Sequence, residues 1–190
     1  MPTQYYYLVA SLPGLTFSFP AALRKNDFLA ECHRHLDPCD YAELEALLDE
    51  RRDRVTTSFS KTWLDADTQL RNAIARQRAL RLGVEEKKYI KMHDGFRVDA
   101  ESAVSDAYSR ANPLERELVL DRYRWNLAEE LSAADRFGLP AVLAYGVMLG
   151  INEHWRSLTP ELGQERLEDL VGMVGVAADE VAGWGGLAAL

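Results

Sequence analysis

Cysteine is scarce in this sequence, which has two among its 190 residues. A disulfide-stabilised scaffold is therefore excluded, and so few thiols favour a reducing compartment. No basic segment precedes an apolar run at the start of the chain, so we expect no signal peptide. No apolar stretch reaches the roughly 18 residues that a membrane span needs. We expect a cytoplasmic protein that meets the inner membrane only peripherally, through partners.

Glycine and proline are also few, at 12 and 7 residues, and the signatures of common enzymes are missing. There is no Gly-rich loop that ends in Gly-Lys-Ser/Thr, no G-x-G-x-x-G motif after a strand and no G-x-S-x-G nucleophile elbow. None of the four histidines has a glutamate three residues before it, which excludes the di-iron pattern of helical bundles. We expect a non-enzymatic protein without a bound cofactor.

One cluster has residues of the kind that bind zinc, although its spacing matches no strong zinc signature. Cys32 and His35 would lie one helical turn apart, and Cys39 could return across the turn at Pro38. The other interpretation makes Cys32 a small buried side chain and places the histidines on the surface. Both stay open, and a zinc-binding or small-ligand-binding helical bundle is the alternative function.

Positive charge is limited as well, and the chain has a net charge of −8. An acidic protein repels nucleic acids and anionic lipids, so neither is an expected partner. Basic residues nevertheless gather in residues 71–91, where seven basic and two acidic side chains give a net charge of +5. This segment is either a solvated face or a patch that binds an acidic partner protein. Its basic residues are Arg71, Arg76, Arg78, Arg81, Lys87, Lys88 and Lys91.

Helix signals follow one another in the first half of the chain. A helix that begins at Asn26 or Asp27 would bury an apolar face with a spacing of 3.6 residues. Asp40 and Glu43 have the spacing of a capping box, which predicts the start of the next helix. A third helix is expected over residues 58–82, and Gly83 follows it as a C-terminal cap.

The second half shows the same pattern after a polar segment, residues 84–98, which we expect to be a loop between two halves. A weaker helix is predicted over residues 99–110. The run Asn112-Pro113 supplies a cap and a first-turn proline for a helix that would bury Leu114 and Leu118. Further helices are expected from Pro140 and over residues 167–181, before a glycine-rich tail around Trp184.

These elements predict an all-α fold, an antiparallel bundle of about seven helices joined by short connections. The bundle is expected to be one domain over residues 1–190, with a sub-boundary in the loop 84–98 if it forms two small subdomains. Tyr5–Leu12 is aromatic and β-branched, which suits a short strand, yet no second strand is evident. This segment is expected to be extended or a short helix, and the choice stays open.

Three segments together resemble a known family. They are residues 5–13 (Tyr-Tyr-Tyr-Leu-Val-Ala-Ser-Leu-Pro), residues 115–125, which run through mixed charges to Trp125, and residues 143–155, which hold Tyr145. Their order resembles an uncharacterised bacterial family typically encoded beside V-type ATPase subunits. The last segment is also distantly similar to the C subunit of V/A-type ATPases.

The resemblance implies a helical protein that works in or beside that rotary machine, because the C subunit is an all-helical adapter between the rotor stalk and the membrane ring. Leu149, Gly150 and Asn152 stand where this adapter tends to carry a Lys-Glu pair and a further Glu. A rotor-adapter role and an assembly or accessory role therefore both stay open. The expected partners are other protein subunits of a V-type ATPase, without nucleic acid binding or direct membrane insertion.

Overall fold

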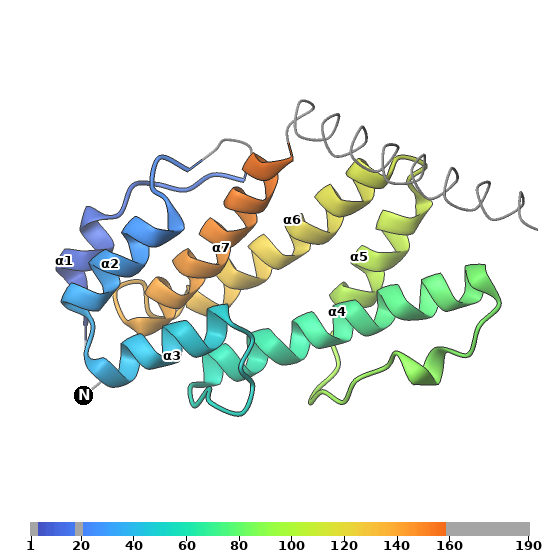
Figure 1. The fold of residues 1–190 in the computed structure, drawn as a ribbon, viewed down its shortest axis with the longest axis horizontal. Coiled ribbons are helices and arrows are strands. Elements are labelled where there is room, and N and C mark those ends of the chain that lie inside the picture. Colours follow the sequence, from blue (N-terminus) through green and yellow to red (C-terminus); the bar gives the residue numbers. More distant parts are fainter. Residues whose placement is uncertain (1–3, 18–20, 159–190) are drawn as a thin grey trace, which may run out of the picture. The chain divides into compact units, whose positions relative to one another are not determined.

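Helices form the regular secondary structure of the computed structural model, which describes residues 4–17 and 21–158 (Figure 1). Within these residues there is no strand, and the pairing of Gln4 with Gly138 is an isolated bridge. The all-α fold is therefore confirmed. Its elements are α1 Tyr6–Ser11, α2 Lys25–His35, α3 Pro38–Leu48, α4 Ser58–Leu82, the 3-10 turn η1 Glu86–Lys88, α5 Val98–Ser109, α6 Pro113–Ser132 and α7 Leu139–Ser157.

The chain divides into two compact units, residues 1–153 and residues 154–190. The first unit holds α1 to α6 and most of α7, and the loop 84–98 lies inside it. The second unit is described only at residues 154–158, which complete the last turn of α7. The helix predicted over residues 167–181 and the tail around Trp184 lie outside the described residues. In the part of the chain that the structure covers, no helix has both the length and the apolar character to cross a membrane.

The longest helix, α4, has the limits that its sequence predicts. The side chain of Thr57 accepts a hydrogen bond from the Ser60 N–H, which caps the first turn. Gly83 ends the helix with a φ of +66°, in the left-handed region that glycine adopts without steric cost. Between these caps the helix buries Trp63 and Leu70 and packs against α5 and α6. Figure 1 shows α4 as a long helix that runs beside α5 and α6.

The caps predicted for α2 and α3 are wrong, because a residue far along the chain binds the start of α2 and because α3 begins earlier, at Pro38. The first residue of α2 is Lys25, whose N–H donates to Glu153 of α7 at 2.8 Å. Neither Asn26 nor Asp27 is the cap. In α3, Pro38 takes the first position, so that Asp40 lies within the first turn. The start of α2 thus depends on a tertiary contact, whereas the start of α3 is set locally by Pro38.

Glu43 does not complete a capping box but binds the start of α4. Its carboxylate accepts hydrogen bonds from the N–H and hydroxyl groups of Thr56 and Thr57, at 2.7 to 3.1 Å. Burial raises the pKa of this carboxyl, but hydrogen bonds from Ser60, Thr56 and Thr57 outweigh burial, so the pKa is lowered. Glu43 is therefore a charged structural link between α3 and α4.

The N-terminal segment is a short helix and not a strand. Leu8 of α1 is buried, whereas Tyr6 and Tyr7 are exposed. The helix provides its own backbone hydrogen bonds, which an unpaired strand could not do. The N–H of Tyr5 donates to the Phe137 carbonyl at 2.6 Å, so the start of the chain is fastened to the connection between α6 and α7.

Helix α6 begins as predicted but presents a different face to the core. The Asn112 side chain accepts a hydrogen bond from the Leu114 N–H at 3.0 Å, which confirms the cap. Leu114 and Leu118, however, are 51% and 39% exposed, so their predicted burial is wrong. The buried residues of this helix start only at Leu120.

Glycine permits a close contact of α7 with α2 and α3. A Cβ atom on Gly146 would lie 3.1 Å from Leu44 Cδ1 and equally close to Phe28 Cε1. Such a distance is tighter than most contacts of real Cβ atoms, so the backbone of α7 lies against these side chains. Gly150, one turn along, has open space around it.

Candidate binding site

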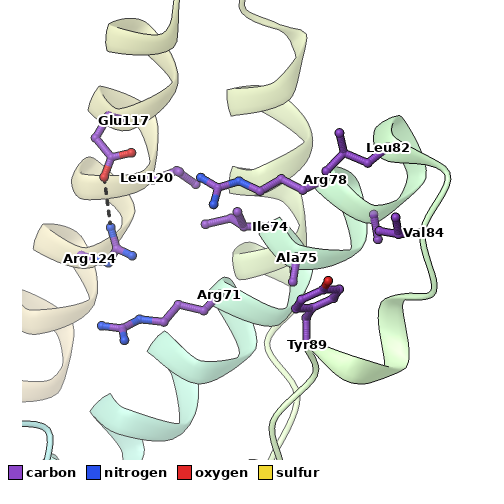
Figure 2. A pocket seen from close by; sticks show the side chains of 11 residues that line it. Arg71, Ile74, Ala75, Arg78, Leu82, Val84, Tyr89, Glu117, Leu120 and Arg124 are labelled. Carbon is purple, nitrogen blue, oxygen red and sulfur yellow. Dashed lines mark ion pairs between the residues drawn. The ribbon is translucent and has the colours of Figure 1, made fainter. Parts of the chain in front are cut away.

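A pocket of about 600 Å³ lies between α4, α6 and the chain that follows α4 (Figure 2). This volume falls in the range of small-molecule sites. We call it the apolar pocket. Its lining residues are Arg71, Ile74, Ala75, Arg78, Ala79, Leu82, Val84, Tyr89, Glu117, Leu120 and Arg124.

A buried charge network forms one end of the apolar pocket. Arg124 of α6 donates through Nε to Asp67 of α4 at 2.9 Å and through Nη1 to Asp121 at 2.7 Å. The Nε atom of Arg71 lies 2.7 Å from the second oxygen of Asp67. Asp67 thus binds two guanidinium groups from two helices, and it joins α4 to α6.

The two arginines of the network keep their charge near neutral pH. Burial works against the charge of Arg124, but Asp67 and Asp121 outweigh it, so the pKa of this guanidinium is raised. A hydrogen bond to Glu50 is the largest effect that raises the pKa of Arg71. A group with a pKa far above 7 stays protonated near pH 7 and does not exchange protons with a substrate. We therefore interpret the network as structural.

The seven basic residues of the segment 71–91 do not form one patch. Arg71 donates to Glu50 at 2.8 Å, and Arg76 donates to Glu101 at 2.6 Å, so both are paired within the fold. Arg78 and Arg81 turn toward Tyr108 of α5: Arg78 Nε donates to the tyrosine hydroxyl and Arg81 to its backbone carbonyl, each at 3.2 Å.

The three lysines of the segment behave differently. Lys87, Lys88 and Lys91 are exposed, and their ammonium groups form no ion pair with any residue that the structure describes. Charge that is free of intramolecular partners remains available to an acidic surface. Of the predicted partner-binding residues, these three have ammonium groups without a hydrogen bond or ion pair among the described residues.

Two buried amide side chains of α4 fix the backbone of the loop that carries the lysines. Asn72 donates to the Lys91 carbonyl at 2.7 Å and accepts from the Lys91 N–H at 2.9 Å. Gln69 binds Arg97 in the same way, at 2.9 Å and 2.8 Å. The sequence predicts the loop but not its rigid attachment to α4.

Large apolar side chains on and beside this loop face solvent. Met92 is 94% exposed, Leu80 is 79% exposed and Phe96 is 70% exposed. Single exposed apolar residues are common on protein surfaces, whereas a group of them marks interaction sites. We call the following exposed residues, which lie on the loop or close to it in the sequence, the docking face: Leu80, Lys87, Lys88, Tyr89, Lys91, Met92, Phe96 and Val98.

The candidate zinc ligands are not assembled. Cys32 is fully buried and Cys39 is exposed. His35 packs against the ring of Tyr7, and its Nε2 atom lies 3.6 Å from Glu31. Among the described residues, the ligand atoms of these three side chains do not come close enough together to hold one ion. Burial also raises the pKa of the Cys32 thiol to about 12, which disfavours the thiolate that zinc requires.

Sequence reasoning missed the residues that shape the site: Asp67, Gln69, Asn72, Asp121 and Arg124. Each is a polar residue at a position where the helix would otherwise present an apolar face. Such a position predicts a buried hydrogen-bonding role. It does not identify the partner, because Asp67 and Arg124 are 57 residues apart.

A comparison with family models finds one match, to the family described as protein of unknown function (DUF2764), over residues 40–176. Neither the curated proteins nor the solved structures contain a match to this chain. The matched segment holds α3 to α7, and with them the apolar pocket, the charge network and the docking face. Because the family model covers well over half of the sequence, the chain belongs to the DUF2764 family.

Proposed function

We propose that this protein is a non-enzymatic helical subunit or accessory factor of a V-type ATPase, and that it acts by binding other protein subunits. The observation that carries the proposal is the docking face, in which exposed apolar side chains and lysines without an ion pair among the described residues lie on or close to one clamped loop. The order of the three sequence segments that resemble a V-type ATPase neighbour supplies the identity of the partner.

The composition of the docking face suits a protein partner. Burial of the exposed side chains Met92, Phe96 and Leu80 against a partner would stabilise the complex by roughly 25 cal/mol per Å² of apolar area. Aromatic residues and methionine are enriched at protein interfaces. Lys87 and Lys88 add positive charge, which favours an acidic partner surface and speeds its association.

The attachment of the loop also favours binding. Asn72 and Gln69 hold the backbone at Lys91 and Arg97, so the loop does not have to be ordered when a partner arrives. Pre-organisation of this kind reduces the entropy that association costs. A clamped loop with an exposed apolar surface is the arrangement of a recognition element.

A pull-down with quantitative mass spectrometry tests the proposal. The tagged full-length chain, expressed in its native host, should co-purify V-type ATPase subunits. The double variant Met92→Ser/Phe96→Ser should lose at least about ten-fold of that signal, because two apolar anchors are removed. Leu114→Ser/Leu118→Ser is the matched control, since both leucines are exposed on α6, outside the docking face.

The outcomes separate the two parts of the proposal. Absence of every ATPase subunit from the wild-type sample would refute the ATPase role. Equal recovery by the wild type and by Met92→Ser/Phe96→Ser would keep that role and reject the docking face.

A further inference from the structure

Arg78, Arg81 and Arg116 surround one aromatic ring, at the end of α4 and the start of α6. The guanidinium carbons of Arg81 and Arg116 lie 4.8 Å and 5.6 Å from the centre of the Tyr108 ring. Arg78 donates to the hydroxyl of the same tyrosine. A hollow of about 350 Å³ is lined by all three arginines and by Tyr108. We call it the arginine hollow.

The three arginines of the hollow lack ionic partners among the described residues. Their hydrogen bonds there go to Tyr108 and to the backbone carbonyls of Arg110 and Ala111. None forms an ion pair with a carboxylate in this part of the chain, unlike Arg71, Arg76 and Arg124. Three like charges around one ring repel one another, so a bound anion would stabilise the cluster.

Other features of the hollow also favour an anion. Pro113 lines it, which places the hollow at the N-terminal end of the 20-residue helix α6, where the helix dipole is positive. The opposing group is Glu117 in the wall. Its carboxylate lies 3.9 Å from Arg124, which offsets part of its charge. Guanidinium groups bind the oxygens of phosphate or carboxylate in pairs, so either head group suits the site.

The apolar pocket adjoins the arginine hollow. Arg78, Leu82, Glu117 and Leu120 line both. Figure 2 shows the guanidinium end of Arg78 and the side chain of Ile74 beside Leu120, and Ala75 and Val84 on the side of Tyr89. A ligand that fills both spaces needs an anionic end and an apolar body.

We infer that this double site binds an amphipathic anion, a phosphate or carboxylate head group with an alkyl chain. The head group lies among Arg78, Arg81 and Arg116, and the chain lies in the apolar pocket. The ligand is either a free molecule or an acidic lipid of a bilayer, since the two share this chemistry. The inference does not depend on the proposed ATPase role.

Titration calorimetry on the full-length protein provides the test, with decyl phosphate below its micelle concentration as the probe. Decyl phosphate should bind at least about ten-fold more tightly than either of two comparison ligands. Decyl maltoside has the same chain with an uncharged head group, and inorganic phosphate has the anionic group without the chain. Equal binding of decyl phosphate and decyl maltoside would overturn the inference, and so would no binding of decyl phosphate.

Two variants locate the ligand. Arg81→Gln/Arg116→Gln should weaken decyl phosphate binding by about ten-fold or more, because charge-assisted hydrogen bonds are lost. Ala75→Phe should weaken decyl phosphate by blocking the chain and leave inorganic phosphate unchanged. The matched control is Arg54→Gln/Arg136→Gln, which removes two exposed arginines that lack an ion pair among the described residues.

Equal losses in the arginine variant and in its control would show attraction by net charge alone and would refute the site. Circular dichroism of each variant excludes loss of fold as the cause. Vesicles of phosphatidylcholine with and without phosphatidylglycerol then identify the source. Binding that needs phosphatidylglycerol and is displaced by decyl phosphate indicates a bilayer lipid, whereas binding of decyl phosphate without vesicle binding indicates a free amphiphile.

Discussion

The side-chain amide of Asn72 pairs with both backbone groups of Lys91, as one strand residue pairs with another, although Asn72 belongs to a helix. Asn72 is almost fully buried, so water does not compete for these hydrogen bonds. The backbone of the loop at Lys91 is thereby fastened to α4, although its side chains are exposed. Its exposed side chains have a fixed position as a result.

Replacing Asn72 should therefore loosen the loop as well as destabilise the protein. Asn72→Leu leaves the Lys91 N–H and carbonyl without partners, which should cost about 1–3 kcal/mol in the free energy of unfolding. The Lys91 amide should exchange with deuterium faster while the core amides of α6 stay protected, as measured by NMR. Gln77→Leu, on the same helix, is the control, and an equal effect of both substitutions would argue against the clamp.

The Asp67–Arg124 pair should be worth far more than the ion pairs at the surface. Arg124→Met leaves Asp67 and Asp121 buried with less compensation, so we expect a loss of about 3–5 kcal/mol by chemical denaturation. Arg110→Met removes the exposed pair with Asp106 and should cost less than about 1 kcal/mol. Similar losses for the two variants would show that the network is solvated.

Glu43 should make stability dependent on acid. Because its pKa is lower in the folded state than its ordinary value of 4.5, its contribution is complete above pH 4.5 and disappears as pH falls through the lower, folded value. Glu43→Gln should therefore destabilise the protein at pH 7 and differ less from the wild type near about pH 3. Denaturant titrations at both pH values provide the measurement. A constant difference between the two proteins would assign the loss to packing.

The two cysteines should react at very different rates with a thiol reagent. Cys39 is exposed and should be labelled at once, whereas Cys32 is buried, has a pKa of about 12 and should react only as the protein unfolds. Mass spectrometry at successive times counts the labels, and Cys39→Ser identifies the fast site. Protection of both thiols by added zinc, reversed by a chelator, would restore the metal-site hypothesis.

The helices were predictable wherever the signal is local. The proposed limits of α4 needed only Ser58, the apolar spacing and Gly83, each of which lies within or next to the helix itself. The start of α6 likewise needed only Asn112 and Pro113. The local signal failed at α2, because Glu153, which accepts the hydrogen bond of Lys25, is distant in the sequence. At α3 the start was misplaced because Pro38, and not Asp40, begins the helix.

The candidate site was predictable only in part, for the same reason. The cluster of basic residues was visible in the sequence, but pairing divides it: Arg71 and Arg76 bind carboxylates, Arg78 and Arg81 bind Tyr108, and the lysines stay free. Composition reports the charge of a segment and not the carboxylates that lie beside it. Arg116, which completes the arginine hollow, is 35 residues beyond Arg81, and no spacing rule joins them.

The bond from the Lys25 N–H to Glu153 spans 128 positions of the chain, which sets an order of events during synthesis. At 5–20 residues per second, a ribosome needs roughly ten seconds to produce Glu153 after Lys25 has been added. The first turn of α2 lacks its acceptor throughout that time. The N-terminal helices therefore complete their docking only after α7 has been translated, and a nascent chain arrested before residue 153 would leave α2 open to chaperones and proteases.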